Sequence, residues 1–343
     1  MLELEAFSVE LTSPLETAAG TIDHREGFLV TVEYDGRQGV GEATPLPGWT
    51  ESRSECRTAL SRAAEIAEEL DWGIALAKTD QPAARHGLAL ALADARARAV
   101  EEPLYRYFGD DRFVPSVPVN ATIGDKPSAE TVESAAAAVD EGFDCLKIKV
   151  GARSVDEDVE RLQAVRERVG DGVELRADAN GAWSVEQADH AFDALADVGV
   201  SYVEQPLPAA NLEGHARLRG GAVDVALDES LTEYAVAEIL AASATDVLVV
   251  KPMVVGGPDR AREIALTARE AGVDPVVSTT VDAVVGRTGA VHLAASLPDV
   301  RASGLATASL LADDLSADPA PVTDGAIEVP QGKGLGLPDR PTE

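Results

Sequence analysis

The sequence is poor in positive charge, and lysine is its rarest charged residue. Among 343 residues there are 60 acidic and 29 basic side chains, so the formal net charge is −31 and the pI is about 4.4. A field this negative repels phosphate, which excludes nucleic acid and anionic membrane surfaces as partners. The acidic residues are spread along the chain, and this predicts a solvated surface rather than a disordered tail.

An acidic, lysine-poor surface is typical of adaptation to concentrated salt, where screening removes the repulsion between like charges. We therefore expect a halophilic protein. Where lysine has largely been removed from the surface, the lysines that remain are favoured candidates for chemistry. The six lysines are Lys78, Lys126, Lys147, Lys149, Lys251 and Lys333.

Cysteine and long apolar runs are also scarce. The two cysteines, Cys56 and Cys145, lie far apart without CxxC spacing, so the sequence indicates neither a disulfide framework nor a zinc site. There is no run of 18 apolar residues, and no basic segment followed by an apolar stretch at the start. We expect a soluble, cytoplasmic protein, and no feature of the sequence indicates an oligomeric state.

The pattern of the chain changes near residue 112. Before it, the alternating runs 2–11 and 28–34 predict strands, residues 12–26 a loop, and residues 52–70 and 83–100 helices, which together make a small α+β unit. After it, short apolar strands alternate with amphipathic helices such as 128–141, 155–169, 185–198 and 258–271. The predicted strands cover residues 117–120, 145–150, 173–177, 202–204, 225–227, 247–250, 275–278 and 300–303.

Eight strands about 25 to 30 residues apart, separated by helical sequence, predict a TIM-like (β/α)8 barrel. A doubly wound sheet is the competing arrangement, but no glycine-rich dinucleotide motif follows any strand. We expect an α/β protein with a capping domain at residues 1–112 and a barrel at residues 113–310. Residues 311–343 are expected to return to the capping domain.

Two lysines alternate within the predicted strand 145–150. Residues i and i+2 of a strand project from the same face, so Lys147 and Lys149 project together, about 6.6 Å apart. At an effective dielectric constant of about 20 they repel by roughly 2.5 kcal/mol, which favours the neutral amine that a general base requires. An isolated pair of this kind more often projects into solvent, so the other strands decide between these interpretations.

Charged residues also end the following strands, and in a barrel the carboxyl ends of the strands gather the reactive groups. Three carboxylates within about 5 Å of one another repel by roughly 3 kcal/mol per pair, and therefore need a counter-ion. One acidic residue at a strand end is more often a loop cap, but Asp178, Glu204 and Asp228 follow consecutive strands. Oxygen ligands without histidine or thiolate favour Mg²⁺, with Mn²⁺ as a possible substitute.

A divalent cation beside lysines suits removal of a proton α to a carboxylate. The ordered set Lys-x-Lys, Asp-Ala-Asn, Glu-Gln-Pro, Asp-Glu-Ser and Lys-Pro resembles the muconate-lactonizing-enzyme subgroup of the enolase superfamily. The resemblance implies that Asp178, Glu204 and Asp228 bind Mg²⁺. It also implies that Lys149 and Lys251 face each other across the substrate.

Within this subgroup, residues 41–51, Arg176 and residues 251–257 resemble the o-succinylbenzoate synthase family. That resemblance implies a Mg²⁺-dependent syn dehydration of a cyclohexadiene carboxylate, in which Lys149 removes the α proton and Lys251 stabilises the developing charge. Lys147 would orient the carboxylate and lower the pKa of Lys149. N-succinylamino-acid racemisation and muconate cycloisomerisation stay open. Dipeptide epimerases of the subgroup carry an Asp-x-Asp pair near the eighth strand, which is absent here.

The expected partner is a small-molecule carboxylate substrate, and loops of the capping domain at 12–26 and 45–52 are expected to close over it. No histidine ends the sixth or seventh strand, so a His–Asp base pair is not indicated, and a non-catalytic barrel would not need these lysines. The expected substrate contacts are Arg176, Asn180, Ser278, Thr279, Thr280 and Gly304.

Overall fold

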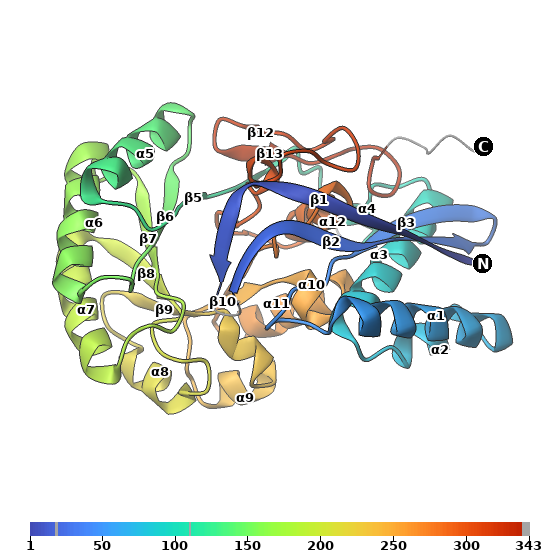
Figure 1. Ribbon diagram of the computed structural model, residues 1–343, viewed down its shortest axis with the longest axis horizontal. Helices are drawn as coiled ribbons and strands as arrows, with labels where there is room; N and C mark the ends of the chain where they lie inside the picture. The colour runs from blue at the N-terminus through green and yellow to red at the C-terminus, as the bar shows by residue number, and fades with distance from the viewer. Residues whose placement is uncertain (18–19, 110, 338–343) are drawn as a thin grey trace.

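The computed structural model describes residues 1–17, 20–109 and 111–337, and its first unit is an antiparallel sheet in the order β1-β2-β3 (Figure 1). Phe28, Val30 and Val32 form a buried core with apolar residues of the neighbouring helices. The strand β3 approaches α3 closely, since a Cβ at Gly41 would overlap the carbonyl oxygen of Gly87. The elements are β1 (Leu2–Thr17), β2 (Gly20–Tyr34), β3 (Arg37–Ala43), α1 (Arg53–Glu69), α2 (Trp72–Ala77), α3 (Pro82–Ala99) and α4 (Leu104–Tyr107).

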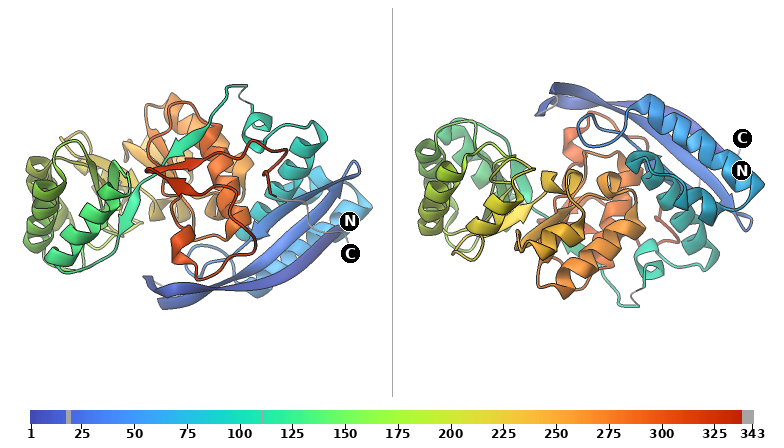
Figure 2. Two further views of the ribbon diagram at one scale, coloured as in Figure 1. Left: turned by 90° about the horizontal axis from the view of Figure 1, so that it is seen from above. Right: turned by 90° about the horizontal axis from the view of Figure 1, so that it is seen from below.

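The prediction of a loop at residues 12–26 is wrong for most of this segment. Here β1 and β2 continue as a paired ribbon, in which Glu10 pairs with His24 and, after a shift of register, Leu15 pairs with Ile22. Cross-strand pairing stabilises this polar stretch, and single-chain periodicity does not reveal a partner. Residues 18–19 lie outside the described residues. The ribbon extends from the capping sheet toward the barrel (Figure 1, Figure 2).

The second unit is a parallel sheet of seven strands in the order β11-β10-β9-β8-β7-β6-β5. Isolated bridges from Val119 to Ser303 and from Ser278 to Gly304 supply the eighth position and close the sheet into a barrel. This confirms the predicted fold class. The strands are β5 (Ala121–Ile123), β6 (Cys145–Lys149), β7 (Glu174–Asp178), β8 (Val200–Glu204), β9 (Asp224–Leu227), β10 (Val247–Val250) and β11 (Asp274–Val277).

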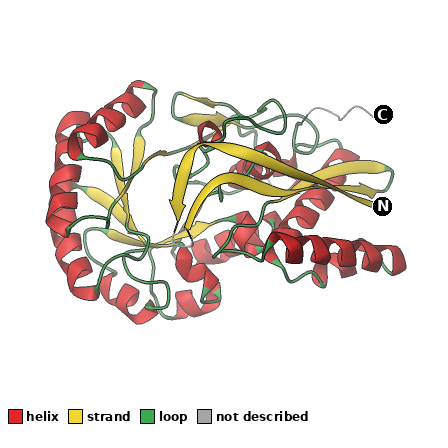
Figure 3. Cartoon of the chain, viewed as in Figure 1, coloured by secondary structure: helices red, strands yellow, loops and turns green. Residues whose placement is uncertain are grey.

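Alternation along the strands separates two apolar layers. Tyr202, Ala226 and Val249 belong to a small cluster inside the barrel, whereas Ile148 and Val203 pack in the layer under the outer helices. These helices surround the strands in Figure 3, and no helix in the described ranges is long and apolar enough to cross a bilayer. They are α5 (Ser128–Asp140), α6 (Val155–Val169), α7 (Val185–Val198), α8 (Leu212–Leu218), α9 (Val236–Ala241), α10 (Pro252–Val255), α11 (Pro258–Glu270) and α12 (Val284–Ala295), with the short 3₁₀ turn η1 (Glu229–Thr232) after β9.

The helices begin where the sequence supplies caps. Ser154 and Ser184 each accept a hydrogen bond from the third residue of the helix that follows, and form complete capping boxes with Glu157 and Gln187. The alternation of strand and helix ends after the eighth strand position, because the helical structure of residues 305–337 is limited to a 3₁₀ turn, η2 (Ala308–Leu310). The eighth β/α unit therefore lacks its helix.

Residues 311–337 instead join the two units. The hairpin of β12 (Val322–Thr323) and β13 (Ala326–Glu328) pairs with β4 (Ser116–Pro118). Beyond it, Gly334 accepts a hydrogen bond from the backbone of Leu104, and Leu335 is buried in a cluster with Phe7 of the capping sheet. The predicted boundaries at residues 112 and 310 stay predictions, and residues 338–343 lie outside the described residues.

A polar seam attaches the capping unit to the barrel. The carboxylate of Glu42, on β3, accepts hydrogen bonds from the backbone N–H groups of Ala283 and Gly286 at distances of 2.8 and 2.7 Å. These groups begin α12, so a side chain of one unit caps a helix of the other. Arg85 on α3 forms a second connection, an ion pair with Asp259 at 2.7 Å. The seam places residues 44–51 beside the carboxyl ends of the barrel strands.

Candidate active site

Both lysines of β6 point into the barrel, as the alternation of a strand predicts. The Nζ atom of Lys147 lies 2.9 Å from Glu204 and 3.2 Å from Asp178. The Nζ atom of Lys149 lies 2.7 Å from Asp178 and 2.6 Å from the side-chain oxygen of Asn180. To this cluster β6 therefore contributes two lysines, and β7 and β8 contribute one carboxylate each.

The repulsion expected between the two lysines is outweighed at Lys147. Burial alone would lower its pKa, but the carboxylates of Glu204 and Asp178 raise the pKa of Lys147 well above its ordinary value. The predicted shift toward a neutral amine is therefore wrong for Lys147, because the two carboxylates attract its ammonium form more strongly than Lys149 repels it. In this arrangement Lys147 is an ammonium group that neutralises the cluster.

The three predicted metal ligands come together in the barrel interior. Asp178, Glu204 and Asp228 are only 1%, 2% and 3% exposed. Burial, followed by the Asp178 carboxylate, raises the pKa of Glu204 to about 7. Burial also raises the pKa of Asp228 to about 6, although Lys251 opposes it. At Asp178 the two lysines of β6 overcome the effect of burial and hold the pKa below its usual range. The carboxylates thus interact strongly with one another and with the lysines.

Lys251, which follows β10, contacts the cluster from the side opposite β6. Its Nζ atom lies 2.5 Å from Asp228, and 3.8 Å from the centre of the Trp49 ring. Burial would lower the pKa of Lys251, but Asp228 and Glu229 raise it. Trp49 belongs to the capping unit and was not predicted as a site residue. One indication of its role was present in the sequence, because Trp49 lies in the segment 41–51 that resembles the o-succinylbenzoate synthase family.

The donor set fits a hard divalent cation. Three buried carboxylates without histidine or thiolate are the ligands that Mg²⁺ prefers. The carboxylate of Glu229 also has a buried oxygen, Oε2, that makes no hydrogen bond. Ammonium groups now lie against the carboxylates, and within the described ranges no three acidic, histidine or cysteine side chains are grouped closely enough to hold an ion as they stand. A cation that binds here would replace these ammonium contacts.

Two predicted substrate contacts have other partners. The side chain of Asn180 accepts a hydrogen bond from Lys149 and donates one to Glu229 at 2.9 Å. The guanidinium of Arg176 is fully buried, 3.0 Å from Glu174 and 2.6 Å from the carbonyl oxygen of Ala302. Arg176 therefore points away from the carboxylate cluster, and the structure does not support its expected contact with the substrate.

The other four predicted contacts lie where the seventh and eighth strands end. Ser278 donates a hydrogen bond to the carbonyl oxygen of Gly304 at 3.4 Å, and Thr280 donates to Asp282 at 2.5 Å. The hydroxyl of Thr279 lies 3.2 Å from that of Thr307. These residues form one rim of the site, and their contact with a substrate stays a prediction.

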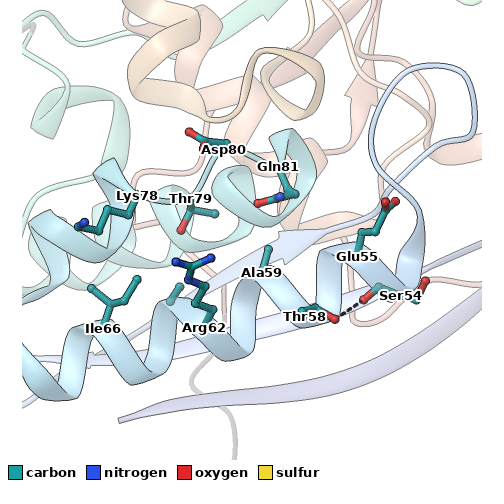
Figure 4. Close-up of a pocket in the computed structure, with 11 residues that line it drawn as sticks. Ser54, Glu55, Thr58, Ala59, Arg62, Ile66, Lys78, Thr79, Asp80 and Gln81 are labelled. Carbon is teal, nitrogen blue, oxygen red and sulfur yellow. Dashed lines mark hydrogen bonds between the residues drawn. The ribbon is translucent and has the colours of Figure 1, made fainter.

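A separate cavity of about 300 Å³ lies on the capping unit, between α1 and the loop before α3 (Figure 4). Arg62, Lys78 and Thr79 are among its lining residues, and none of the predicted site residues is. The carboxylate cluster in the barrel is therefore the better candidate for an active site.

Comparison with known proteins agrees with this geometry. The protein-family model described as "Enolase C-terminal domain-like" matches residues 130–339, which include all three carboxylates and the three lysines of the site. The chain belongs to the enolase superfamily. A second model, described as "MenC, N-terminal domain", matches residues 2–95. Together with the relatives below, these matches place it in the muconate-lactonizing-enzyme-like subgroup of that superfamily.

Relatives of the same superfamily align over nearly the whole chain. The L-Ala-D/L-Glu epimerase of Bacillus subtilis (strain 168) is 29% identical over 98% of this chain and 95% of its own length. The hydrophobic dipeptide epimerase of Enterococcus faecalis is 30% identical over 98% of each chain.

Solved structures give the same result. The substrate-liganded B. subtilis epimerase has a TM-score of 0.88 at 27% identity, and covers 98% of this chain and 97% of its own. The muconate lactonizing enzyme of Pseudomonas fluorescens, complexed with muconolactone, has a TM-score of 0.87 at 25% identity and covers 98% and 95%. The E. faecalis enzyme, complexed with Mg and the dipeptide L-Leu-L-Tyr, has a TM-score of 0.86 at 26% identity and covers 98% of each chain.

Proposed function

We propose that the protein is an o-succinylbenzoate synthase, a Mg²⁺-dependent lyase of menaquinone biosynthesis. It would dehydrate 2-succinyl-6-hydroxy-2,4-cyclohexadiene-1-carboxylate to 2-succinylbenzoate. The observation that carries this proposal is the position of two lysines around one buried carboxylate cluster. Lys149 ends the second barrel strand and Lys251 follows the sixth, so they lie on opposite sides of an eight-membered ring of strands. The match of residues 2–95 to the MenC N-terminal domain favours this reaction over others of the subgroup.

The chemistry follows from the positions of the lysines. Lys149 removes the proton on C1, the electron pair of that bond forms the new ring double bond, and the C6–hydroxyl bond breaks. The same Nζ atom returns its proton to the departing hydroxyl, which leaves as water, so one group on one face of the ring gives a syn elimination. Mg²⁺ held by Asp178, Glu204 and Asp228 would neutralise the charge that develops on the substrate carboxylate.

The remaining groups keep their protons. Lys251 contacts Asp228 and the indole of Trp49, and as an ammonium group it stabilises negative charge on the substrate from the opposite face. Lys147, between Glu204 and Asp178, orients the substrate carboxylate. Trp49 covers this side of the site and excludes water from it.

N-succinylamino-acid racemisation and muconate cycloisomerisation are the alternatives. Lysines on both faces of a substrate can remove a proton from one face and return it to the other, which racemisation requires. The relatives described above include epimerases and a muconate lactonizing enzyme. A dipeptide substrate is disfavoured because residues 303–308 lack an Asp-x-Asp pair to hold its amine.

The decisive test follows two reactions on the same purified protein with Mg²⁺. Loss of the cyclohexadiene absorbance reports dehydration, and exchange of the α proton of N-succinyl amino acids in D₂O reports racemisation. We expect dehydration, and we expect Lys149→Ala to lower kcat by about 10²- to 10⁴-fold while Mg²⁺ binding is retained. Lys126→Ala removes an exposed side chain whose Nζ atom donates a hydrogen bond to Ser134, and it should leave both rates unchanged.

Three results would contradict the proposal. Substantial turnover by the Lys149→Ala variant would remove Lys149 as the base. Proton exchange without dehydration would move the assignment to the racemase. No heat of Mg²⁺ binding in calorimetry would indicate a barrel that has kept its fold without the chemistry.

A further inference from the structure

The three carboxylates of the site come from three different strand ends, and one buried side chain connects these ends. Gln205 follows Glu204 directly and is 0% exposed. Its backbone carbonyl accepts a hydrogen bond from Gly181, three residues after Asp178, at 2.7 Å. Its side-chain oxygen accepts one from the backbone N–H of Asp228 at 3.1 Å. Gln205 thus contacts the chain within three residues of every predicted metal ligand.

The loop after Asp228 is held by the same amide. The side-chain oxygen of Gln205 also accepts a hydrogen bond from the backbone N–H of Ser230 at 3.2 Å, and its nitrogen donates to the Ser230 hydroxyl at 2.9 Å. That nitrogen donates a further bond to the carbonyl oxygen of Leu207 at 3.0 Å. The oxygen faces two backbone N–H groups, and the nitrogen faces the Leu207 carbonyl and the Ser230 hydroxyl, which also lies 3.4 Å from the oxygen. Rotation of the amide would turn its nitrogen toward the two N–H donors, so only one orientation of the amide satisfies the site.

His215 reinforces this orientation. Its Nε2 atom accepts a hydrogen bond from the backbone N–H of Leu207 at 3.3 Å, and lies 3.4 Å from the Gln205 nitrogen. Burial lowers the pKa of His215 to about 4, which keeps the imidazole neutral and Nε2 available as an acceptor. The amide nitrogen of Gln205 therefore faces hydrogen-bond acceptors. Rotation of the amide would place its oxygen against the acceptors and its nitrogen against the N–H donors.

The backbone at these strand ends needs such support. Asn180 and Gln205 have φ values of +44° and +42°, a left-handed conformation that residues with a Cβ adopt at a cost of order 1–3 kcal/mol. Surrounding contacts must compensate for this cost. At Gln205 the compensation comes from the side-chain hydrogen bonds described above. The bonds to Asp228 and Ser230 link the Glu204 segment to the Asp228 segment, and the bond to Leu207 stays within the Glu204 segment.

We propose that Gln205 is a positioning residue for the metal ligands, which fixes the Asp178, Glu204 and Asp228 segments relative to one another where Mg²⁺ would bind. Gln205 would act through its contacts with the backbone of the ligand-bearing segments, and not as a ligand of the ion. Groups that orient metal ligands typically contribute 10- to 100-fold to metal affinity. The inference rests on the metal site of the proposed function.

The test is calorimetric titration of Mg²⁺ into metal-free protein without substrate, with urea unfolding of each variant alongside. Gln205→Met keeps the length of the side chain but removes the amide, and we expect it to raise the Kd for Mg²⁺ at least tenfold. Gln331→Met is the matched control, because Gln331 hydrogen-bonds Tyr105 and the carbonyl oxygens of Val114 and Val329, away from the site. It should lower stability without changing the Kd.

A Kd of Gln205→Met within twofold of the wild-type value would overturn the inference, whatever its stability. Should that variant fail to fold, Ser230→Ala decides in its place. It removes the hydroxyl that accepts from the amide, and we expect a Kd at least threefold higher, whereas no change would overturn the proposal. The wild-type titration separates the two proposals, since absence of Mg²⁺ binding by the unaltered protein contradicts the proposed function itself.

Discussion

The Glu42 carboxylate predicts an unusual dependence of stability on pH. It is fully buried, and accepts hydrogen bonds from Ala283, Gly286 and the hydroxyl of Thr44. Burial, and then the neighbouring Asp282 carboxylate, raise the pKa of Glu42 from 4.5 to about 7 against these donors. The folded protein therefore holds a proton that the unfolded chain releases. The resulting stabilisation is complete below pH 4.5 and is lost as the pH rises through 7.

A pKa rise from 4.5 to about 7 corresponds to roughly 3 kcal/mol of unfolding free energy. Glu42→Gln has nearly the same shape and stays neutral at every pH, so it lacks this contribution to the slope. We subtract the unfolding free energy of the variant from that of the wild type at each pH. This difference should fall by roughly 3 kcal/mol between pH 4.5 and pH 8. Asp282, Arg25 and His86, which also face Glu42, are present in both proteins.

Urea unfolding at fixed ionic strength across this pH range measures the difference. The control is Glu157→Gln, because Glu157 is an exposed carboxylate whose pKa is held below its usual value by hydrogen bonds to Ser154. A lowered pKa gives stabilisation that is already complete above pH 4.5. The difference in unfolding free energy between wild type and Glu157→Gln should therefore be constant across this pH range. Parallel pH profiles of wild type and Glu42→Gln, within about 0.5 kcal/mol, would refute the reasoning about Glu42.

Three other predictions concern the site, the barrel interior and the surface. Trp49→Leu removes the ring over Lys251, worth about 0.5–2 kcal/mol, so steady-state assays should show kcat about 3- to 30-fold lower with Mg²⁺ affinity unchanged; an unchanged kcat contradicts this role. Arg176→Met removes one of the two guanidinium groups that contact Glu174 and leaves the carbonyl oxygen of Ala302 without this donor, so it should lower the unfolding free energy by about 1–3 kcal/mol, whereas a large rise in KM with little loss of stability would restore Arg176 as a substrate contact. Raising KCl from about 0.1 M to about 2 M shortens the Debye length severalfold and should raise Tm in scanning calorimetry, since the net charge is −31; a Tm independent of salt argues against halophilic adaptation.

The barrel and its carboxylates could be predicted because they depend on local rules. Alternation within a strand decides which side chains share a face, and parallel strands of a barrel end on one side. Asp178, Glu204 and Asp228 therefore converge in any barrel that keeps these strands. The same rules placed Lys147 and Lys149 on one face, as the structure has them.

Features that depend on distant partners could not be predicted in this way. The pKa direction of Lys147 is decided by carboxylates on other strands, and Arg176 donates a hydrogen bond to the carbonyl oxygen of Ala302, which lies far along the chain. The ribbon near Leu15 was expected to be a loop because its partner strand was not known. Gln205 stands in the motif Glu-Gln-Pro, but only the fold shows that it connects three segments.

The path of the chain through the capping unit bears on its synthesis. Leu335 is buried against Phe7 and Leu29 of the capping sheet, and its backbone N–H bonds to the carboxylate of Asp94 on α3. A domain made of contiguous residues can fold on the ribosome before the next one emerges. Here the packing of the N-terminal sheet includes Leu335, which lies more than 200 residues later in the chain. We therefore expect the final packing of the sheet to follow translation of the whole barrel.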